Sequence, residues 1–288
     1  MTKNILHTIQ RDLGSFSKGQ KRIAAFILEN FDRAAFLTAS KLGQEVGVSE
    51  STVVRFAAEL GYDGYPSMQR ALQEMIRGRL TSTQRIRAAD DLLLGQDVLD
   101  TVLQRESERL RSMAEETDRA AFQGAVEQII AARHIYILGL RSSHFIAEYL
   151  NFYLHLIFEN VTLVQSNAAG EIFEQLFRIG PGDVLLAISF PRYSNVTVNT
   201  VKFARDRGAT IVAITDNELS PVYQMSDAAL LAPSEMISFV DSMVAPLSLI
   251  NALLVAIGYR MGKDVSKTFG ELEDIWNEYG VFGRTDDE

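Results

Sequence analysis

Two short segments of the chain combine hydroxyl and guanidinium side chains in a way that suits the binding of an anion. Residues 139–143 read Gly-Leu-Arg-Ser-Ser, and residues 189–194 read Ser-Phe-Pro-Arg-Tyr-Ser. Each segment follows an apolar run typical of a strand and precedes a helical pattern, so its hydroxyls should lie at a helix N-terminus, where backbone N–H groups attract anions. The candidate effector-binding residues are Arg141, Ser142, Ser143, Ser189, Arg192 and Ser194.

Two alternative roles stay open for these side chains. Serine is a common helix cap, so the hydroxyls could serve the helices alone. Two arginines beside two helix N-termini would be repelled by the positive potential there unless an anion or a carboxylate lies opposite them. That partner is either a bound ligand or a carboxylate of the chain, such as Glu171 or Asp216.

A second constellation, at residues 38–61, has the spacing of a helix-turn-helix. Gly47 permits the left-handed backbone of a tight turn, and Ser49 can cap a second helix that ends near Gly61. The N-terminal half of such a second helix enters the major groove of DNA. An ordinary helical hairpin is the alternative. The candidate DNA-binding residues are Lys41, Ser49, Glu50, Ser51, Thr52, Val54 and Arg55.

The charge distribution supports DNA binding by the N-terminal part of the chain. The net charge is −9, which by itself argues against a nucleic-acid-binding protein. Residues 1–87, however, hold 13 Lys and Arg against 8 Asp and Glu, whereas the remainder holds 15 against 29. A basic N-terminal region therefore precedes an acidic body, and cations such as Lys18, Lys21 and Arg22 suit phosphate contacts.

The elements that must position these residues fall into two regimes. Up to about residue 80 the apolar spacing is helical, and beyond about residue 133 short β-rich runs alternate with helical stretches. We predict an all-α helix-turn-helix domain over 1–80, a helical linker over 81–120 and an α/β domain over 121–288 with a parallel sheet flanked by helices. The expected strands are 135–138, 161–164, 184–189, 211–215 and 228–231.

The whole chain resembles the RpiR-type regulators, in which a helix-turn-helix domain is fused to a sugar isomerase (SIS) domain. The resemblance rests on residues 47–49 and 53–56 in the N-terminal part and on the segments 139–143 and 189–194 in the body. It implies phosphosugar sensing and assembly as a homodimer or homotetramer. It also implies that Ser143, Ser189 and Ser194 contact phosphate, with Ser142 as a neighbour.

The chain departs from the family pattern at two places within these segments. Arg141 stands where the first segment of the family has its second glycine, and Pro191-Arg192 replaces Ser-Gly in the second segment. Arginine is a planar, permanently charged donor suited to bidentate binding of carboxylate or phosphate. The departures therefore favour an effector with more acidic groups than one phosphate, such as a phosphorylated sugar acid.

Several other functions are excluded or disfavoured. The chain has no cysteine, which excludes disulfides and thiol chemistry. Residues 1–10 lack the pattern of an export signal, so a cytoplasmic location is expected. The apolar stretch 243–259 is interrupted by polar residues and predicts a buried helix rather than a membrane span.

A polar stripe on the helix after the first loop raises the question of a metal. It consists of His144, Glu148, Asn151 and His155, which share one helix face. The two histidines are about three turns apart, too far for one ion, so we expect no metal and no cofactor. The stripe fits a polar seam that faces a subunit or a ligand.

These observations predict a transcriptional regulator of carbohydrate metabolism genes rather than an enzyme. Its expected partners are a double-stranded DNA operator, a phosphorylated sugar or sugar-acid effector and further copies of the chain. The alternative is a sugar-phosphate isomerase with an accessory helical domain, whose proton transfer would need a base such as Glu148, His155 or Glu171. The basic N-terminal region would then have no evident use.

Overall fold

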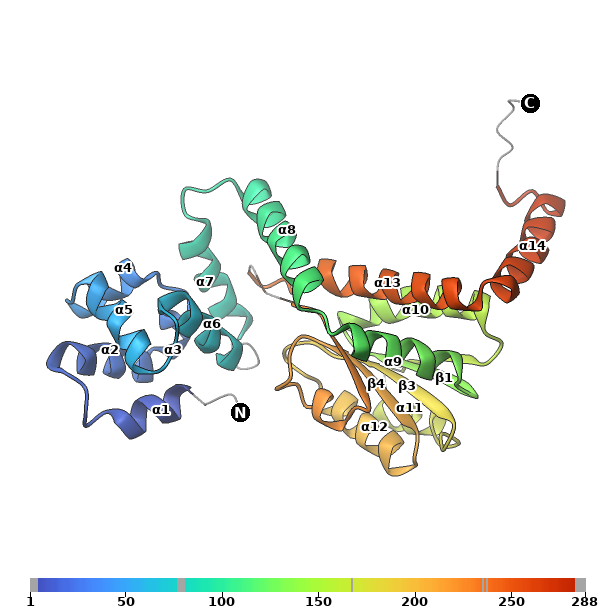
Figure 1. Ribbon diagram of the computed structural model, residues 1–288, viewed down its shortest axis with the longest axis horizontal. Coiled ribbons are helices and arrows are strands. Elements are labelled where there is room, and N and C mark those ends of the chain that lie inside the picture. The colour runs from blue at the N-terminus through green and yellow to red at the C-terminus, as the bar shows by residue number, and fades with distance from the viewer. Residues whose placement is uncertain (1–4, 77–80, 167, 235, 237, 283–288) are drawn as a thin grey trace. The chain divides into compact units, whose positions relative to one another are not determined.

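The chain forms two compact units, which we describe from a computed structural model (Figure 1). The structure describes residues 5–76, 81–166, 168–234, 236 and 238–282. One unit comprises Met1–Gln104 with Glu235–Asp241 and is called the helical unit here. The other comprises Arg105–Ser234 with Ser242–Glu288 and is called the α/β unit.

The helical unit is built from short helices whose starts are set by hydroxyl caps. Ser17 forms a capping box with Gln20 at the start of the second helix, and Phe16 before it packs edge-on against Phe56 with ring centroids 5.1 Å apart. The helices are α1 (Ile5–Asp12), α2 (Lys18–Glu29), α3 (Phe31–Ala34), α4 (Ala39–Val46), α5 (Glu50–Glu59), α6 (Tyr65–Ile76) and α7 (Ser82–Leu93). One buried apolar cluster joins the first six.

The α/β unit contains the predicted parallel sheet. Its strands are β1 (His134–Gly139), β2 (Val161–Val164), β3 (Asp183–Ile188), β4 (Thr210–Thr215) and β5 (Ala228–Leu231), in the order β2-β1-β3-β4-β5 with every pairing parallel. The helices are α8 (Val98–Glu116), which contains the division between the units, α9 (Arg119–Ile130), α10 (Ser143–Ile157), α11 (Ala169–Gln175), α12 (Asn195–Asp206), α13 (Val244–Met261) and α14 (Lys263–Glu278). This arrangement confirms the predicted fold class.

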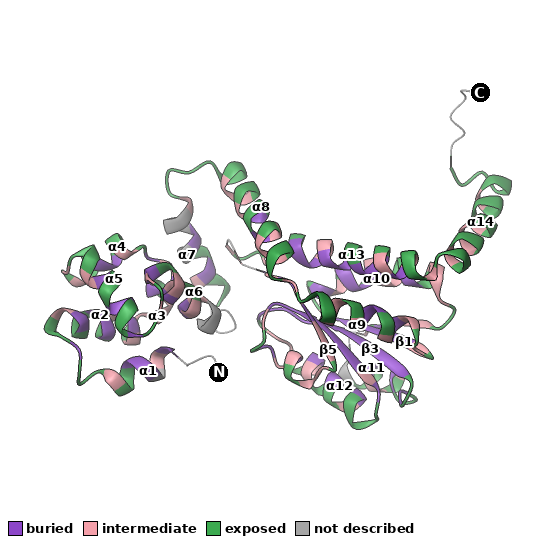
Figure 2. Ribbon diagram, in the orientation of Figure 1, coloured by how far each residue is buried: buried purple, intermediate pink, exposed green. Residues whose placement is uncertain are grey.

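Helices cover both faces of the sheet, and the strands are accordingly apolar on both sides. Ile135 and Ile137 of β1 belong to the cluster under α9, α10 and α13, whereas Tyr136 and Leu138 belong to the cluster over α11 and α12. The two sets alternate because successive side chains of a strand point to opposite faces. Figure 1 shows the two helical layers, and Figure 2 shows the buried sheet between them.

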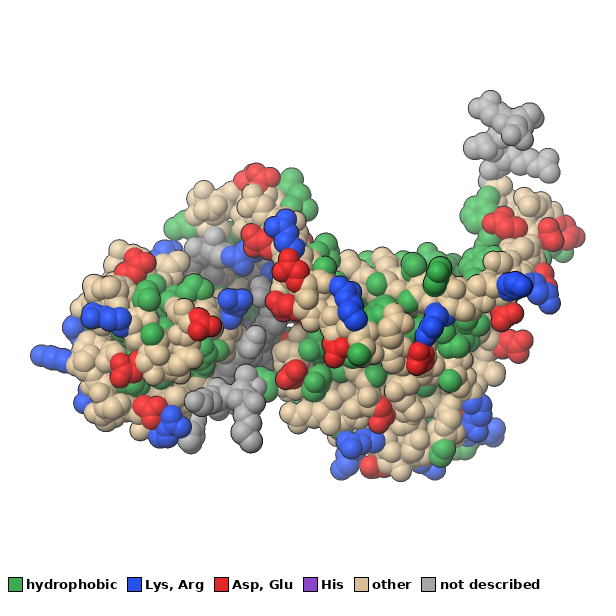
Figure 3. All heavy atoms as spheres, in the orientation of Figure 1, with side chains coloured by type: hydrophobic (Ala, Val, Ile, Leu, Met, Phe, Trp, Pro, Cys, Tyr) green, Lys and Arg blue, Asp and Glu red, His purple; other side chains and the backbone are tan. Residues whose placement is uncertain are grey.

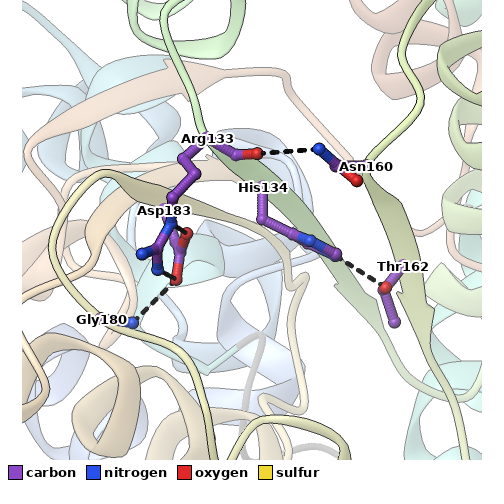
Figure 4. A network of polar contacts seen from close by, with 6 residues as sticks. All are labelled: Arg133, His134, Asn160, Thr162, Gly180 and Asp183. Carbon is purple, nitrogen blue, oxygen red and sulfur yellow. Dashed lines mark hydrogen bonds and ion pairs between the residues drawn. The ribbon is translucent and has the colours of Figure 1, made fainter.

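A polar network fastens the N-terminal ends of three strands (Figure 4). Asp183, which is 1% exposed, accepts two hydrogen bonds of 2.9 and 2.8 Å from the Arg133 guanidinium and a third, of 2.9 Å, from the Gly180 N–H. His134 Nε2 and Thr162 Oγ1 form a hydrogen bond of 2.8 Å between β1 and β2. The network lies at the edge of the sheet opposite the two serine and arginine loops.

The long apolar helix α13 is buried on one side only. Leu249, Leu253 and Ile257 are buried in the core, whereas Val255 and Tyr259 are 71% and 86% exposed. By length and composition this helix could cross a membrane, and 39% of it is buried within the unit. The expected helix is therefore present, but only one side of it is buried.

Candidate functional site

The helix-turn-helix spacing predicted from the sequence corresponds to α4, a tight turn and α5. Thr38 caps α4, its Oγ1 accepting from the Lys41 N–H at 3.2 Å, and Ser49 caps α5, its Oγ accepting from the Thr52 N–H at 3.3 Å. Gly47 ends α4 in the left-handed conformation, with φ of 66°. The two caps and this glycine fix where each helix starts and where the chain turns.

The two helices approach each other closely at Gly43. A Cβ on this residue would lie 2.8 Å from the Val48 carbonyl oxygen, a distance at which the backbone must shift. Val53 and Phe56 on the inner face of α5 are fully buried. The outer face of α5 is therefore set by the packing of its inner face.

The exposed face of α5 carries the predicted DNA-binding side chains. Glu50, Ser51, Val54 and Arg55 are exposed, and Arg55 Nε donates to the Ser51 carbonyl at 3.3 Å, which holds the arginine along the helix. The hydroxyl of Ser49 is engaged as the cap and also lies 2.8 Å from the Thr52 hydroxyl.

Further cations lie around the turn. Exposed Lys18, Lys21 and Arg22 belong to the first turns of α2, and a Cβ on Gly47 would meet the Arg22 guanidinium at 3.3 Å. A Cβ on Gly19 would lie 3.4 Å from the Thr52 methyl group, so the start of α2 abuts the start of α5. Figure 3 shows several Lys and Arg side chains, in blue, on the helical unit.

The two serine and arginine loops lie side by side in the α/β unit because they follow the neighbouring parallel strands β1 and β3. Ser143 and Ser189 are buried, at 5% and 4% exposure, whereas Arg141 and Arg192 are exposed. Gly139 is required at the end of β1, since a Cβ there would lie 2.6 Å from the Ser143 carbonyl oxygen.

Both arginines adopt the left-handed backbone conformation, with φ of 59° for Arg141 and 64° for Arg192. They are the only non-glycine residues with positive φ in the described part of the chain. This conformation costs an L-residue roughly 1–2 kcal/mol and is the one that glycine adopts freely. The two loops therefore keep the backbone of a glycine at the positions where the chain has arginine.

The serines at the helix starts do not cap. Ser142 precedes α10 and Ser194 precedes α12, and neither side chain accepts a capping hydrogen bond. The capping role left open by the sequence is thus unused at both positions. In each loop a serine stands at the start of a helix, beyond the C-terminal end of a strand.

A pocket of about 470 Å³ opens at this edge beside the first loop. It is lined by Leu140, Arg141, His144, Gln165 and Ser166. Gln165 and Ser166 directly follow β2 and were not predicted from the sequence, because neither belongs to a motif. They line the pocket because β2 pairs with β1 in parallel, which brings the two strand ends together.

A second polar cluster holds the other loop in place. The Thr215 hydroxyl donates to the Ser189 carbonyl at 2.7 Å and lies 2.8 Å from the Ser220 hydroxyl, and the Tyr193 hydroxyl donates to Asp216 at 2.7 Å. All of these side chains lie at the ends of β3 and β4. The loop that carries Arg192 is thereby anchored to the strand after it.

The polar residues that share one face of α10 have different surroundings. His144 lines the pocket and lies 3.1 Å from Glu148, while His155 is exposed near the end of the helix. Among the described residues, no group of three or more His, Cys, Asp or Glu is arranged to hold a metal ion. Glu171, a candidate base of the isomerase alternative, accepts a hydrogen bond from Ser166.

Comparison with known proteins identifies both parts of the chain. The family model for the helix-turn-helix domain of the rpiR family matches residues 3–77, and that for the SIS domain matches residues 128–256. The transcriptional regulator HexR of Pseudomonas aeruginosa is 27% identical over 273 residues, covering 91% of this chain and 92% of that protein. An HTH-type transcriptional regulator of Haemophilus influenzae is 28% identical over 232 residues, or 79% of each chain.

Two solved structures share the fold. The sugar isomerase domain of an RpiR transcription factor from Sphaerobacter thermophilus is 25% identical, with a TM-score of 0.59, and covers 62% of this chain and 99% of its own. Vibrio vulnificus NanR, solved in complex with ManNAc-6P, is 21% identical with a TM-score of 0.59 over 97% of this chain and 100% of its own. With its helix-turn-helix unit and its SIS domain, the chain belongs to the rpiR family of transcriptional regulators.

Proposed function

We propose that the protein regulates carbohydrate metabolism genes from the cytoplasm by binding a duplex DNA operator, and that a phosphorylated sugar or sugar acid controls this binding. The single observation that carries the proposal is the conjunction of an exposed α5, within the basic residues 1–87, with two anion-suited loops at one sheet edge. An isomerase would need the loops but not the helix-turn-helix.

The DNA-binding role is assigned to the exposed start of α5 and the cations beside it. Arg55 suits contact with guanine or phosphate, and Lys41 suits a phosphate contact. Ser49 caps the start of α5, and its hydroxyl lies 2.8 Å from that of Thr52. We assign both hydroxyls to contact with a phosphate of the DNA. Glu50, Ser51 and Val54 complete the surface that faces the groove.

The effector role is assigned to the C-terminal edge of the SIS sheet. Ser143, Ser189 and Ser194, with Ser142 beside them, would hold a phosphate through hydroxyls and the N–H groups at the starts of α10 and α12. The ManNAc-6P complex of NanR supports this class of ligand, since that protein shares the fold. The pocket beside Arg141 would take the sugar.

The arginines support an effector with a second acidic group. Arg141 and Arg192 keep a strained backbone that glycine would relieve, a feature typical of ligand-binding sites, and Arg141 lines the pocket. Bidentate binding of a carboxylate is a role that fits both side chains. We therefore assign a phosphorylated sugar acid as the preferred effector class.

The protein would act as a homodimer or homotetramer. A symmetric dimer presents two copies of α5, and operator half-sites are then separated by whole turns of DNA. An effector that changes how the two helical units are spaced changes the affinity for the operator.

A binding assay on DNA from upstream of the protein's own gene tests the DNA-binding part of this proposal. We expect affinity to fall steeply with salt, because phosphate contacts release counterions. Arg55→Ala should weaken binding to the operator by about 1–3 kcal/mol, and an equal loss on random DNA would assign Arg55 to phosphate instead. Absence of DNA binding, together with turnover of a sugar phosphate, would establish the isomerase alternative.

A further inference from the structure

The chain passes between its two units at three places, and two of these places enclose one short segment. After β5 the chain leaves the α/β unit at Ser234, contributes Glu235–Asp241 to the helical unit, and returns at Ser242 shortly before α13. We call the described residues of this segment, Met236 and 238–241, the strap. The connection between two elements of the α/β unit is therefore made through the helical unit.

The middle of the strap belongs to the helical unit through one apolar and one ionic contact. Met236 packs against the buried apolar cluster of that unit and pairs with Asp241 in an isolated antiparallel bridge. Asp241 accepts a hydrogen bond of 2.7 Å from the guanidinium of Arg85 on α7, and Arg85 is only 2% exposed. The helix α7 is itself joined to α3, since Gln84 donates to Asp32 at 3.0 Å. The strap is thus tied to helices of the helical unit.

The ends of the strap are fixed in the α/β unit by buried polar side chains. The hydroxyl of Ser234, which is 1% exposed, donates to the Ser242 carbonyl at 2.9 Å and holds the two ends together. The Ser242 hydroxyl donates to Glu106 at 2.8 Å, and Glu106 accepts from Arg109 at 2.7 Å. Asp241 and Ser242 are consecutive, yet the first is held by an ion pair of the helical unit and the second by an ion pair of the α/β unit.

The first end of the strap is also connected to the loop that carries Arg192. The Ala232 N–H donates to the Thr215 carbonyl at 2.8 Å, which continues the pairing of β4 and β5 toward the strap. The Thr215 hydroxyl donates to the Ser189 carbonyl at 2.7 Å, at the start of that loop. Thr215 and Ala232 are both fully buried. A buried hydrogen-bonded path therefore runs from the loop to the residues that precede the strap.

We propose that the strap couples the C-terminal edge of the sheet to the helical unit, so that a ligand held by residues 189–194 changes the DNA-binding helices through it. Coupling between distant sites requires an element with two arrangements that both sites bias. Consecutive Cα atoms are about 3.8 Å apart, so the chain has no slack between Asp241 and Ser242. A displacement of the fixed ends therefore either moves the helical unit or separates Asp241 from Arg85.

The inference rests on the proposed function and deepens it by naming the path between effector and operator. A buried ion pair adds little net stability compared with apolar side chains of similar volume, whereas the loss of one partner is costly. The pair between Arg85 and Asp241 is thus better suited to a contact that is either made or broken than to simple reinforcement of the fold. The other link between the units, α8, is the competing route.

Hydrogen exchange of the full chain tests the strap without any effector. Thr215→Val removes the hydroxyl bond to Ser189 at one end of the path, and exchange of α7 at the other end should rise by about fivefold or more, the usual size of coupling between sites. Asp241→Asn should itself raise the exchange of α7, and Thr215→Val should then add nothing. Thr200→Val is the matched control, because it removes an equally buried hydroxyl bond on α12, outside the path.

Three results of the exchange experiment would overturn the proposal. One is unchanged exchange of α7 in the Thr215→Val chain. Another is an equal rise in the Thr200→Val control. The third is a rise with Thr215→Val that is the same with and without Asp241→Asn, since the two ends would then not be linked through Asp241.

Operator affinity tests the same coupling with a ligand, and 6-phosphogluconate serves as the phosphorylated sugar acid. Asp241→Asn should keep the separate affinities for DNA and for this probe but lose the change in DNA affinity that the probe causes in the native chain. Glu127→Gln, which breaks the exposed ion pair with Arg260 inside the α/β unit, is the matched control and should keep the response.

The two experiments separate failure of the strap from failure of the proposed function. A response to the probe that Asp241→Asn retains would overturn the strap and assign the coupling to α8. A native chain that responds to no phosphorylated sugar acid would count against the proposed function, and the exchange of α7 would then decide the strap alone.

Discussion

At the scale of single residues, the proposed effector site is distinguished by two arginines that adopt the backbone conformation of glycine. Arg141 and Arg192 have φ of 59° and 64°. They follow β1 and β3, two paired parallel strands whose C-terminal ends lie side by side. The backbone strain and the guanidinium charge are separate properties of these residues. They can be tested separately because glycine removes both, whereas alanine removes the charge and keeps the strain.

We expect Arg141→Gly and Arg192→Gly to raise the free energy of unfolding of the full chain by about 1 kcal/mol, since glycine adopts positive φ without strain. Both variants should bind phosphorylated sugar acids more weakly, as measured by calorimetry, and neutral-sugar phosphates nearly as well as the native chain. Arg141→Ala and Arg192→Ala should lose the same affinity without gaining stability. Arg205→Ala, an exposed arginine at the end of α12, is the control. Unchanged affinity in the Arg192 variants would show that this arginine serves structure.

Of the residues that line the pocket, the sequence analysis singled out Arg141 and His144 but not Gln165 and Ser166. Arg141 and Arg192 stand out because they replace glycines in a recognisable pattern. Gln165 and Ser166 line the pocket only because β2 lies next to β1, and strand order depends on tertiary packing that no local motif records. The positive φ at both arginines was likewise not predicted, because arginine has no preference for that conformation.

His134 at the opposite edge of the sheet makes the stability depend on pH. Burial lowers the pKa of His134 below its ordinary value of 6.5, against the attraction of Asp183. Below pH 6.5 the unfolded chain protonates this histidine more readily than the folded chain does. The contribution of His134 to the free energy of unfolding is therefore fully present above pH 6.5 and is lost as the pH falls toward the lowered pKa of the folded state. Urea unfolding of the full chain at pH 7.5 and at pH 5.5, roughly one unit either side of the ordinary pKa, should show this loss. His134→Gln should reduce it, and an identical pH dependence in that variant would contradict the assignment.

At the scale of secondary structure elements, the DNA-binding surface depends on how closely α4 and α5 pack. Gly43→Ala should destabilise the full chain by about 1–3 kcal/mol through overpacking against the Val48 carbonyl, even though alanine favours helix more than glycine does. Gly14→Ala, at a position with open space and no positive φ, is the control. Chemical unfolding measures the loss of stability, and operator binding measures the disturbance of the DNA-binding surface. A Gly43→Ala chain as stable as the control would mean that the turn yields without cost.

Most elements were predictable because periodicity and caps are local. The five apolar runs correspond to the five strands, and Gly47 and Ser49 set the helix boundaries as expected. The apolar run at 243–259 predicted a long helix, but not that one side of α13 would stay exposed. The exposure of a helix face depends on how many other helices pack against it.

At the scale of the whole molecule, an operator-binding unit is joined to a sheet that we propose binds a phosphorylated metabolite. For an effector to control DNA binding, its affinity must differ between the DNA-bound and DNA-free forms of the protein. The effector then changes the affinity for DNA by the same factor by which DNA changes the affinity for the effector. In the homodimer or homotetramer that we propose, the spacing of two copies of α5 would supply the means, since operator recognition depends on that spacing.

The most direct test is the affinity of the full-length protein for its own upstream DNA, titrated with neutral-sugar phosphates and with phosphorylated sugar acids at fixed salt. We expect specific binding that a phosphorylated sugar acid changes by about fivefold or more, the usual size of such coupling. We also expect the Arg192→Ala chain to bind the same DNA but no longer to respond to the acid. DNA binding that no phosphorylated sugar or sugar acid alters, or a response that Arg192→Ala leaves intact, would contradict the proposed regulation.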